Sequence, residues 1–473
     1  MSGERLKWHG RPTTPPQRPH DADPGEARAS GAQEAQHITA KQQDERLSTT
    51  PDAGPTMEEV LERANMFRAL KRVQANRGAP GPDGMTTQEL PESLKKQWPA
   101  VRQRLLNGTY VPQPVRRKAI PKPDGGEREL GIPTVLDRLI QQAILQVLQP
   151  RWDPTFSEHS YGFRPGRSAH QAVARAQEHV AAGFDHVVDI DIEKFFDRVN
   201  HDLLMGRVAQ RITDKRLLKL LRRYLEAGLV LANGVTTQRT EGTPQGGPLS
   251  PLLANLLLDE LDRELQHRDL RFVRYADDCN IYVRSARSAE RVMKSITAWL
   301  QRKLRLKVNP VKSAAAPATT RTFLGFVLRH KTSNGQVIRE IAPKSLDKAK
   351  HRLRSMTHRV RGQSVTLVAR EAGAYLRGWW AYFGHAETHW QAQAMLGWVR
   401  RRLRQLQWIQ WKTPQNRRRQ LLRHGCVGKW ADYAASAACG PWRASNNHGI
   451  NKALGNEHWR RLGIPEIGGP TKR

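Results

Sequence analysis

Two β-forming runs surround a pair of adjacent carboxylates at residues 272–283, and this stretch constrains the fold of the chain most. It reads Phe-Val-Arg-Tyr-Ala-Asp-Asp-Cys-Asn-Ile-Tyr-Val. The β-branched and aromatic residues on either side predict a hairpin that carries Asp277 and Asp278 at its tip. Adjacent like charges repel each other, so a fold that presents them together usually has a use for a cation. Because aspartate is common in turns, a solvated acidic turn is the alternative.

A third carboxylate comes from the segment 186–197. In Val187-Val188-Asp189-Ile190-Asp191-Ile192, strict alternation places Asp189 and Asp191 on one face of a strand and apolar residues on the other. Carboxylates on so apolar a strand cost free energy unless they are paired or bind a metal. The residues alone leave open which of the two carboxylates would be a metal ligand.

The charge of the chain indicates a polyanionic partner. Its formal net charge is +33, and such a field repels itself unless a partner neutralises it, so nucleic acid is the leading candidate. A membrane surface is the weaker one, because no run approaches the ~18 apolar residues of a spanning helix. The first residues lack the apolar core of a secretory signal. Three cysteines without C-x-x-C spacing argue against a disulfide framework or a zinc finger, and a cytoplasmic setting is expected.

The C-terminal part of the chain concentrates this charge. From residue 388 to residue 431 there is no Asp or Glu. Large aromatic side chains, Trp398, Trp408 and Trp411, lie among the basic ones, a pattern typical of a surface where phosphates meet cations and rings stack on unpaired bases. A solvated helix face would normally mix charges of both signs. The candidate nucleic-acid-binding residues are Arg400, Arg401, Arg404, Arg417, Arg418 and Arg419.

A second group of cations lies near a predicted hairpin turn at residues 123–126. Lys122 and Arg128 flank this turn. They could grip a triphosphate, or they could be ordinary solvated surface charge.

These blocks, in this order, resemble the group II intron-encoded reverse transcriptases, also called maturases. The matching segments are 121–126, 161–165, 191–197, 243–251, 275–278 and 376–383. The resemblance implies an α+β, right-hand polymerase fold, with fingers and palm (an antiparallel sheet plus helices) over residues 57–340. A helical thumb or maturase domain over 341–396 and a basic, mostly helical DNA-binding region over 397–473 would follow. Residues 1–56, poor in aromatic and β-branched residues, are expected to be a disordered leader.

The resemblance also implies a metal site. Asp191, Asp277 and Asp278 match the three palm carboxylates that hold two Mg²⁺ ions, and Ile192 matches a neighbouring backbone contact. The family places an aromatic residue five positions after the catalytic aspartate, where it excludes a ribose 2′-hydroxyl. Counted from Asp191 that residue is Phe196, so Asp191 is preferred to Asp189.

Further roles follow for the nucleotide. Lys122 and Arg128 resemble finger residues that bind the incoming deoxynucleoside triphosphate. Gln245 resembles a loop residue beside the template–nucleotide pair, and Lys312 a proton donor to pyrophosphate. The chain shows no Cys- and His-rich HNH endonuclease segment, which suggests the endonuclease-lacking, bacterial class C-like type.

The expected function is that of an RNA-directed DNA polymerase that binds its group II intron RNA, assists splicing, and copies the intron into target DNA during retrohoming. It would work in the bacterial cytoplasm within a ribonucleoprotein, with the oligomeric state open and a dimer as one option. One alternative is a splicing-only RNA-binding scaffold, which the intact carboxylates disfavour. Another is a solitary reverse transcriptase of a retron, CRISPR-linked or diversity-generating system, which the basic tail disfavours.

Overall fold

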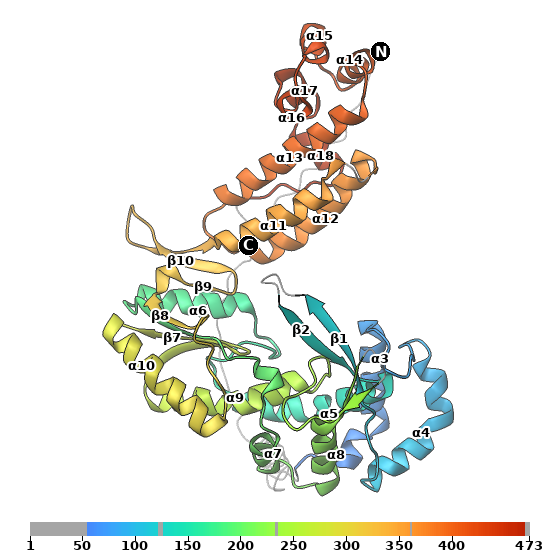
Figure 1. Ribbon diagram of the computed structural model, residues 1–473, viewed down its shortest axis with the longest axis vertical. Helices are drawn as coiled ribbons and strands as arrows, with labels where there is room; N and C mark the ends of the chain where they lie inside the picture. Colours follow the sequence, from blue (N-terminus) through green and yellow to red (C-terminus); the bar gives the residue numbers. More distant parts are fainter. Residues whose placement is uncertain (1–53, 122–125, 232–234, 360–361, 469–473) are drawn as a thin grey trace, which may run out of the picture. The chain divides into compact units, whose positions relative to one another are not determined.

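The computed structural model describes residues 54–121, 126–231, 235–359 and 362–468. From Gly54 onward the chain forms one compact unit. Sheets and helices are mixed along it (Figure 1), which confirms the predicted α+β class. The strands pair antiparallel except in the first sheet, where Val115 and Arg116 pair in parallel with Leu229 and Val230. In the described part of the chain, no helix is long and apolar enough to cross a membrane.

The first region is built around a long hairpin that packs with helices. Strands β1 and β2 pair antiparallel, from Arg116 opposite Ile132 to Pro121 opposite Glu127, and their sheet has the order β2-β1-β4-β5. This confirms the predicted hairpin, although most of its turn lies outside the described residues. The elements of the region are α2 (Met57–Val60), α3 (Arg63–Asn76), α4 (Leu90–Leu106), β1 (Val115–Pro121), β2 (Glu127–Ile132), α5 (Val135–Trp152), β4 (Leu229–Val230) and β5 (Thr236–Thr237).

The central sheet has four antiparallel strands in the order β6-β7-β3-β8. Its strands are β3 (His186–Ile190), β6 (Arg271–Tyr275), β7 (Asp278–Val283) and β8 (Ala314–Pro317). The helices before and after them are α6 (Ala169–Ala181), α7 (His201–Ala209), α8 (Lys215–Glu226), α9 (Ser250–His267) and α10 (Ala286–Trp299), the last continued by a short π-helical turn, η3 (Leu300–Leu304). Short 3-10 turns are η1 (Asp153–Thr155), η2 (Phe195–Asp197) and η4 (Ala318–Thr320).

Strand β3 is covered on both faces, which the alternation in the sequence did not reveal. Val188 and Ile190 belong to one apolar core, shared with α5, α9 and α10. Val187, on the face that carries Asp189, is only 2% exposed and belongs to a second core. That second core also contains residues of α6 and of the C-terminal helices. A carboxylate on β3 therefore lies in largely apolar surroundings on either face, and its charge needs a partner.

A small sheet, with the order β11-β10-β9, leads into the C-terminal helices. Contacts with α6 connect the two parts: His170 Nε2 lies 2.8 Å from the Tyr382 carbonyl oxygen, and Gln177 Nε2 donates to the Val337 carbonyl at 2.6 Å. The elements are β9 (Thr322–Phe323), β10 (Phe326–His330), β11 (Val337–Ile341), α11 (Pro343–Met356), α12 (Val365–Phe383), α13 (Trp390–Gln410), α14 (Pro414–Arg423), α15 (Gly428–Ser436), α16 (Pro441–Ala444), α17 (His448–Ala453) and α18 (Asn456–Arg461).

The prediction that the rings of residues 388–431 stack on bases is wrong for two of them. Trp408 is 1% exposed and Trp411 is 6% exposed, and both belong to the second core. Their interleaving with arginines arises because the apolar face of α13 faces its helical neighbours while the cations occupy its other sides. Trp398 is half-buried.

Candidate active site

The adjacent carboxylates lie where the sequence places them, at the tip of a hairpin. Tyr275 of β6 pairs with Asp278 of β7, so Ala276 and Asp277 form a two-residue turn. Ala276 has φ 58°, the left-handed conformation that tight hairpin turns require at this position. The turn therefore stores some backbone strain, and neighbouring groups have to hold it.

A buried arginine provides that hold. Arg274 is fully buried, and its guanidinium donates to both carboxylate oxygens of Asp262 on α9, at 2.7 and 2.5 Å. The same group donates to Asn255 Oδ1 at 3.1 Å and to the carbonyl oxygen of Ala276 at 2.9 Å. One side chain thus fixes the turn to helix α9.

The segment around Gly162 closes the other side of the turn. The backbone N–H of Tyr161 donates to the Arg274 carbonyl at 2.8 Å, and Asn255 Nδ2 donates to the Gly162 carbonyl at 2.9 Å. A Cβ atom placed on Gly162 would lie 2.2 Å from the backbone nitrogen of Ala276. Glycine is therefore required here, because the two backbones approach too closely for any side chain.

The sequence contains a signal for this network in three polar residues at otherwise apolar positions. Asn255 and Asp262 stand seven residues apart among the leucines of a helix with an apolar face. Arg274 stands between Val273 and Tyr275 in strand β6. Polar residues at such positions usually pair with each other in the core.

The two candidate carboxylates of strand β3 have different partners. The Asp189 carboxylate accepts from Nε and Nη2 of Arg321, at 3.0 and 2.6 Å. Asp191 follows the end of β3, where its backbone N–H donates to Ser313 Oγ at 2.9 Å and its carbonyl accepts from the Asn309 N–H at 2.8 Å. Asp189 is thus neutralised within the chain, whereas Asp191 lines a cavity.

That cavity, of about 930 Å³, brings most of the predicted site residues together. Asp191, Ile192, Phe196, Gln245, Asp277 and Lys312 all line it. Asp278 is the exposed neighbour of this group. Desolvation in the crowded turn, followed by the charges of Asp277, Asp189 and Asp191, raises the pKa of Asp278 to about 7. Because Asp278 is exposed, water screens part of this repulsion.

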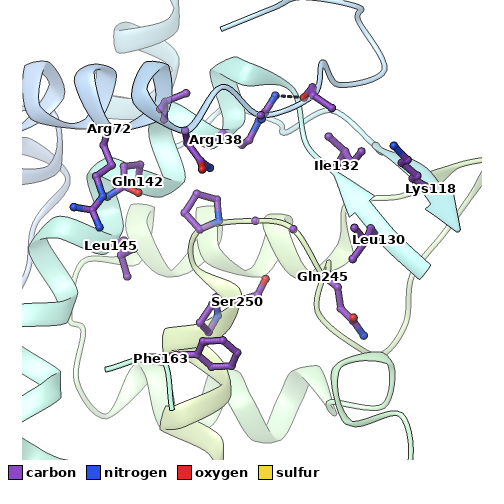
Figure 2. Close-up of a pocket in the computed structure, with 18 of the residues that line it drawn as sticks. Arg72, Lys118, Leu130, Ile132, Arg138, Gln142, Leu145, Phe163, Gln245 and Ser250 are labelled. Atoms are coloured by element: carbon purple, nitrogen blue, oxygen red, sulfur yellow. Dashed lines mark hydrogen bonds between the residues drawn. The ribbon is translucent and has the colours of Figure 1, made fainter. Parts of the chain in front are cut away.

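A second cavity, of about 1000 Å³, adjoins the first and shares Ile120, Phe196 and Gln245 with it. Figure 2 shows Gln245, Leu130 and Lys118 on one side of this space and Arg72 and Gln142 on the other. The carbonyl of Gln245 accepts from the Gly131 N–H at 3.0 Å, so the loop is bonded to strand β2. Gln245 of the loop at residues 243–248 therefore lies where the two spaces adjoin.

The structure describes only part of the remaining candidate nucleotide-binding residues. Lys122 lies outside the described residues. Arg128 stands in β2 opposite Ile120, and its side chain is not described. Gln245 Nε2 lies 3.5 Å from Asp197 Oδ1, and the rings of Phe195 and Phe196 meet edge to face, with centroids 5.1 Å apart.

In the described part of the chain, no group of three or more His, Cys, Asp or Glu side chains is already arranged to hold a metal ion. Asp191 and Asp277 line the same cavity without belonging to such a group.

The candidate arginines of the C-terminal region make contacts within the chain. Arg404 donates to the Ser445 carbonyl at 2.9 Å, and burial lowers its pKa to about 10. The guanidinium carbons of Arg401 and Arg417 lie 4.0 and 4.5 Å from the ring centroids of Trp442 and Trp408. Three more of these residues are Arg400, whose pKa burial lowers, Arg418, which pairs with Asp432, and Arg419, which donates to Asn416 Oδ1 at 2.9 Å. Their role in nucleic-acid binding stays a prediction.

Comparisons with known proteins match two regions of the chain. Residues 120–328 match the family described as "Reverse transcriptase (RNA-dependent DNA polymerase)", and residues 346–425 match "Group II intron, maturase-specific domain". Protein YkfC of Escherichia coli is 32% identical over 333 residues, which cover 62% of this chain and 87% of YkfC.

Two intron proteins match over shorter stretches. The group II intron-encoded protein LtrA of Lactococcus lactis is 41% identical over 184 residues, which cover 39% of this chain and 30% of LtrA. The putative COX1/OXI3 intron 2 protein of Saccharomyces cerevisiae is 34% identical over 155 residues, which cover 33% of this chain and 18% of the yeast protein. The matched part is thus less than a third of the length of either relative.

We predict that Arg274→Met lowers the free energy of unfolding by about 3–5 kcal/mol, because it leaves the Asp262 carboxylate buried without a partner. Arg274→Met combined with Asp262→Leu should recover most of that loss. Chemical denaturation measures both. The control is Arg268→Met, which breaks a helical pair with Glu264 and should cost at most about 1 kcal/mol. A double variant no more stable than Arg274→Met would contradict the assignment.

The raised pKa of Asp278 predicts a pH dependence of stability. Between about pH 4, the pKa range of an unfolded aspartate, and about pH 7, the folded chain binds more protons than the unfolded one. Stability should therefore fall as pH rises through this range in the absence of divalent ions. Thermal unfolding at pH 5 and pH 8 tests this: Asp278→Asn should show a smaller drop than wild type, and Asp347→Asn, on α11, should match wild type. An equal drop in Asp278→Asn would refute the prediction.

Proposed function

This chain belongs to the group II intron-encoded reverse transcriptases and maturases, and on that premise we propose that it is an RNA-directed DNA polymerase that binds its group II intron RNA. It assists splicing of that RNA and copies it into DNA at a target site during retrohoming. The observation that carries the proposal is the cavity where Asp191 and Asp277 lie with Phe196, Gln245 and Lys312.

In this proposal Asp191, Asp277 and Asp278 hold two Mg²⁺ ions, with the backbone at Ile192 beside them. The residues fit divalent cations because Asp191 and Asp277 are carboxylates in the wall of one cavity, and their negative charges contribute to the raised pKa of Asp278. When bound, such ions activate an attacking 3′ oxygen and neutralise charge on the leaving pyrophosphate. The chain itself contributes the placement of the turn through Arg274.

The nucleotide would occupy the same cavity. Phe196 stands in its wall, where it would exclude a ribose 2′-hydroxyl, and Gln245 lies at the border with the second cavity, beside the template–nucleotide pair. Lys312 lines the cavity as the expected proton donor to pyrophosphate. Lys122, which lies outside the described residues, and Arg128, in strand β2, would bind the triphosphate.

The remaining regions would bind the polynucleotides. Residues 57–340 act as fingers and palm, residues 341–396 as a thumb, and residues 397–473 as the region that binds target DNA. The work takes place in the bacterial cytoplasm, in a ribonucleoprotein with the intron RNA. A splicing-only scaffold is the alternative function, and it would dispense with DNA synthesis.

Asp277→Asn should reduce Mg²⁺-dependent extension of a DNA primer on an RNA template on the order of 10³-fold, as when one charge-stabilising group is removed from a phosphoryl-transfer site. The control is Asp189→Asn, which removes a carboxylate of the same sheet that Arg321 already neutralises and should keep extension within about tenfold. Equal extension by wild type and Asp277→Asn would refute the catalytic assignment, and no extension by wild type would favour the scaffold.

Arg419 and Arg404 should respond differently to the loss of their charge. Arg419 is exposed, and its guanidinium donates to Asn416 Oδ1 on the same helix. Arg419→Gln should therefore weaken nucleic-acid binding and lower the salt slope by about one. Arg404→Gln removes a bond to the Ser445 carbonyl and should cost about 1–3 kcal/mol of stability with little change in the slope. Salt titrations of binding and thermal unfolding measure these effects. Unchanged binding in Arg419→Gln would make Arg419 a solvated surface residue.

A further inference from the structure

A groove between helices α11 and α13 combines exposed aromatic surface with positive charge. Its volume is about 470 Å³. The residues that matter for its chemistry are Lys350 and Arg354 from α11 and Trp390, Gln391 and Trp398 from α13.

Trp390 is the feature of the groove that packing does not explain. It is the first residue of α13 and is 65% exposed, although tryptophan is usually well buried. A ring left in water at the wall of a groove is typical of a surface that binds a flat ligand. Trp408 and Trp411, further along the chain, are buried among other side chains, so the exposure of Trp390 is not shared by the tryptophans that follow it at 408 and 411.

Arginine side chains pack against Trp398, a second tryptophan of the groove. Trp398 is half-buried, and the guanidinium carbons of Arg354 and Arg402 lie 5.8 and 5.2 Å from its ring centroid. Arg402 is anchored by a 2.6 Å bond from its Nε to Thr357 Oγ1. One acid, Asp347, and two cations, Lys350 and Arg354, line the groove, so positive charge prevails there.

A polar group in the wall has an unused acceptor. Gln391 is half-buried, and its side-chain oxygen is shielded from solvent without a hydrogen-bond partner among the described residues. Turning the amide towards a ligand would therefore break no bond to that oxygen. Its oxygen and nitrogen could then meet the hydrogen-bonding edge of a ligand.

We infer that this groove binds an unpaired nucleotide, with the base stacked on Trp390 and the phosphate near Lys350 and Arg354. A purely apolar ligand would leave the two cations without a role, and an acidic peptide would leave the exposed ring without one. A base within a duplex is already stacked and cannot enter. The inference rests on the proposed function only in naming RNA as the expected source, because the groove lies almost wholly within the maturase-specific region 346–425.

The test uses the full-length chain and labelled 12-nucleotide probes: oligo(A) RNA, oligo(dA) DNA, and a blunt RNA duplex. Trp390→Leu should weaken binding of the single-stranded RNA about tenfold, the scale of one lost base–aromatic stack, and change duplex binding less than about twofold. Trp390→Phe keeps an aromatic ring and should restore most of the affinity. Leu367→Ala, on another exposed apolar side chain, 44% exposed on α12, should match wild type. Fluorescence anisotropy at constant salt measures all of these.

The DNA probe distinguishes the sources. An equal loss with oligo(dA) assigns the groove to unpaired nucleotides of either kind, and a loss limited to oligo(A) assigns it to RNA. Unchanged binding of both strands by Trp390→Leu, or an equal loss on the duplex, overturns the inference. The effect of Trp390→Leu should persist in an Asp277→Asn background, so the inference can fail or hold independently of polymerase activity.

Discussion

The ion pair between Arg274 and Asp262 determines where the acidic turn lies. Both side chains are fully buried, so each lost its hydration on folding, and the pair contributes little net stability compared with apolar residues of similar size. The pair instead fixes the position of the turn, because the Arg274 guanidinium also donates to the Ala276 carbonyl. Asp277 and Asp278 directly follow that carbonyl in the chain. The positions of two carboxylates thus depend on a residue that reaches neither solvent nor the cavity.

The two carboxylates of the segment around β3 differ in whether an arginine of the chain pairs with them. Asp189 and Asp191 are two residues apart, yet Arg321 neutralises only Asp189. Asp191 lies in the cavity wall with Asp277, and desolvation, followed by the charges of the neighbouring carboxylates, raises the pKa of Asp278. Carboxylates brought close together repel each other and are stabilised by a cation, which is the physical basis of the proposed metal site.

The sequence was sufficient to predict the strands and helices around the site, but not the side-chain contacts between residues that are distant in the chain. The hairpin at residues 272–283, the strand at 186–190 and the helix after the loop at 243–248 follow from local periodicity, and the structure has all three. Periodicity could not show that β3 is buried on both faces, because Val187 is covered by helices distant in sequence. The pairing of Asp189 with Arg321 joins residues 132 positions apart, and only the folded chain brings them together. The choice of Asp191 came from the family pattern around Phe196, not from the strand itself.

The aromatic residues of the basic region show where composition misleads. A mixture of arginine and tryptophan has the same composition whether the rings lie in a core or on a surface, and helix α13 contains both cases. Trp408 packs among the C-terminal helices beneath Arg417, whereas Trp390, eighteen positions earlier, lies in water. Arginine stacked on a buried ring is held by that contact and has less freedom to meet a phosphate. Rings that the fold leaves exposed, such as Trp390, can meet an unpaired base, whereas the buried rings of Trp408 and Trp411 cannot.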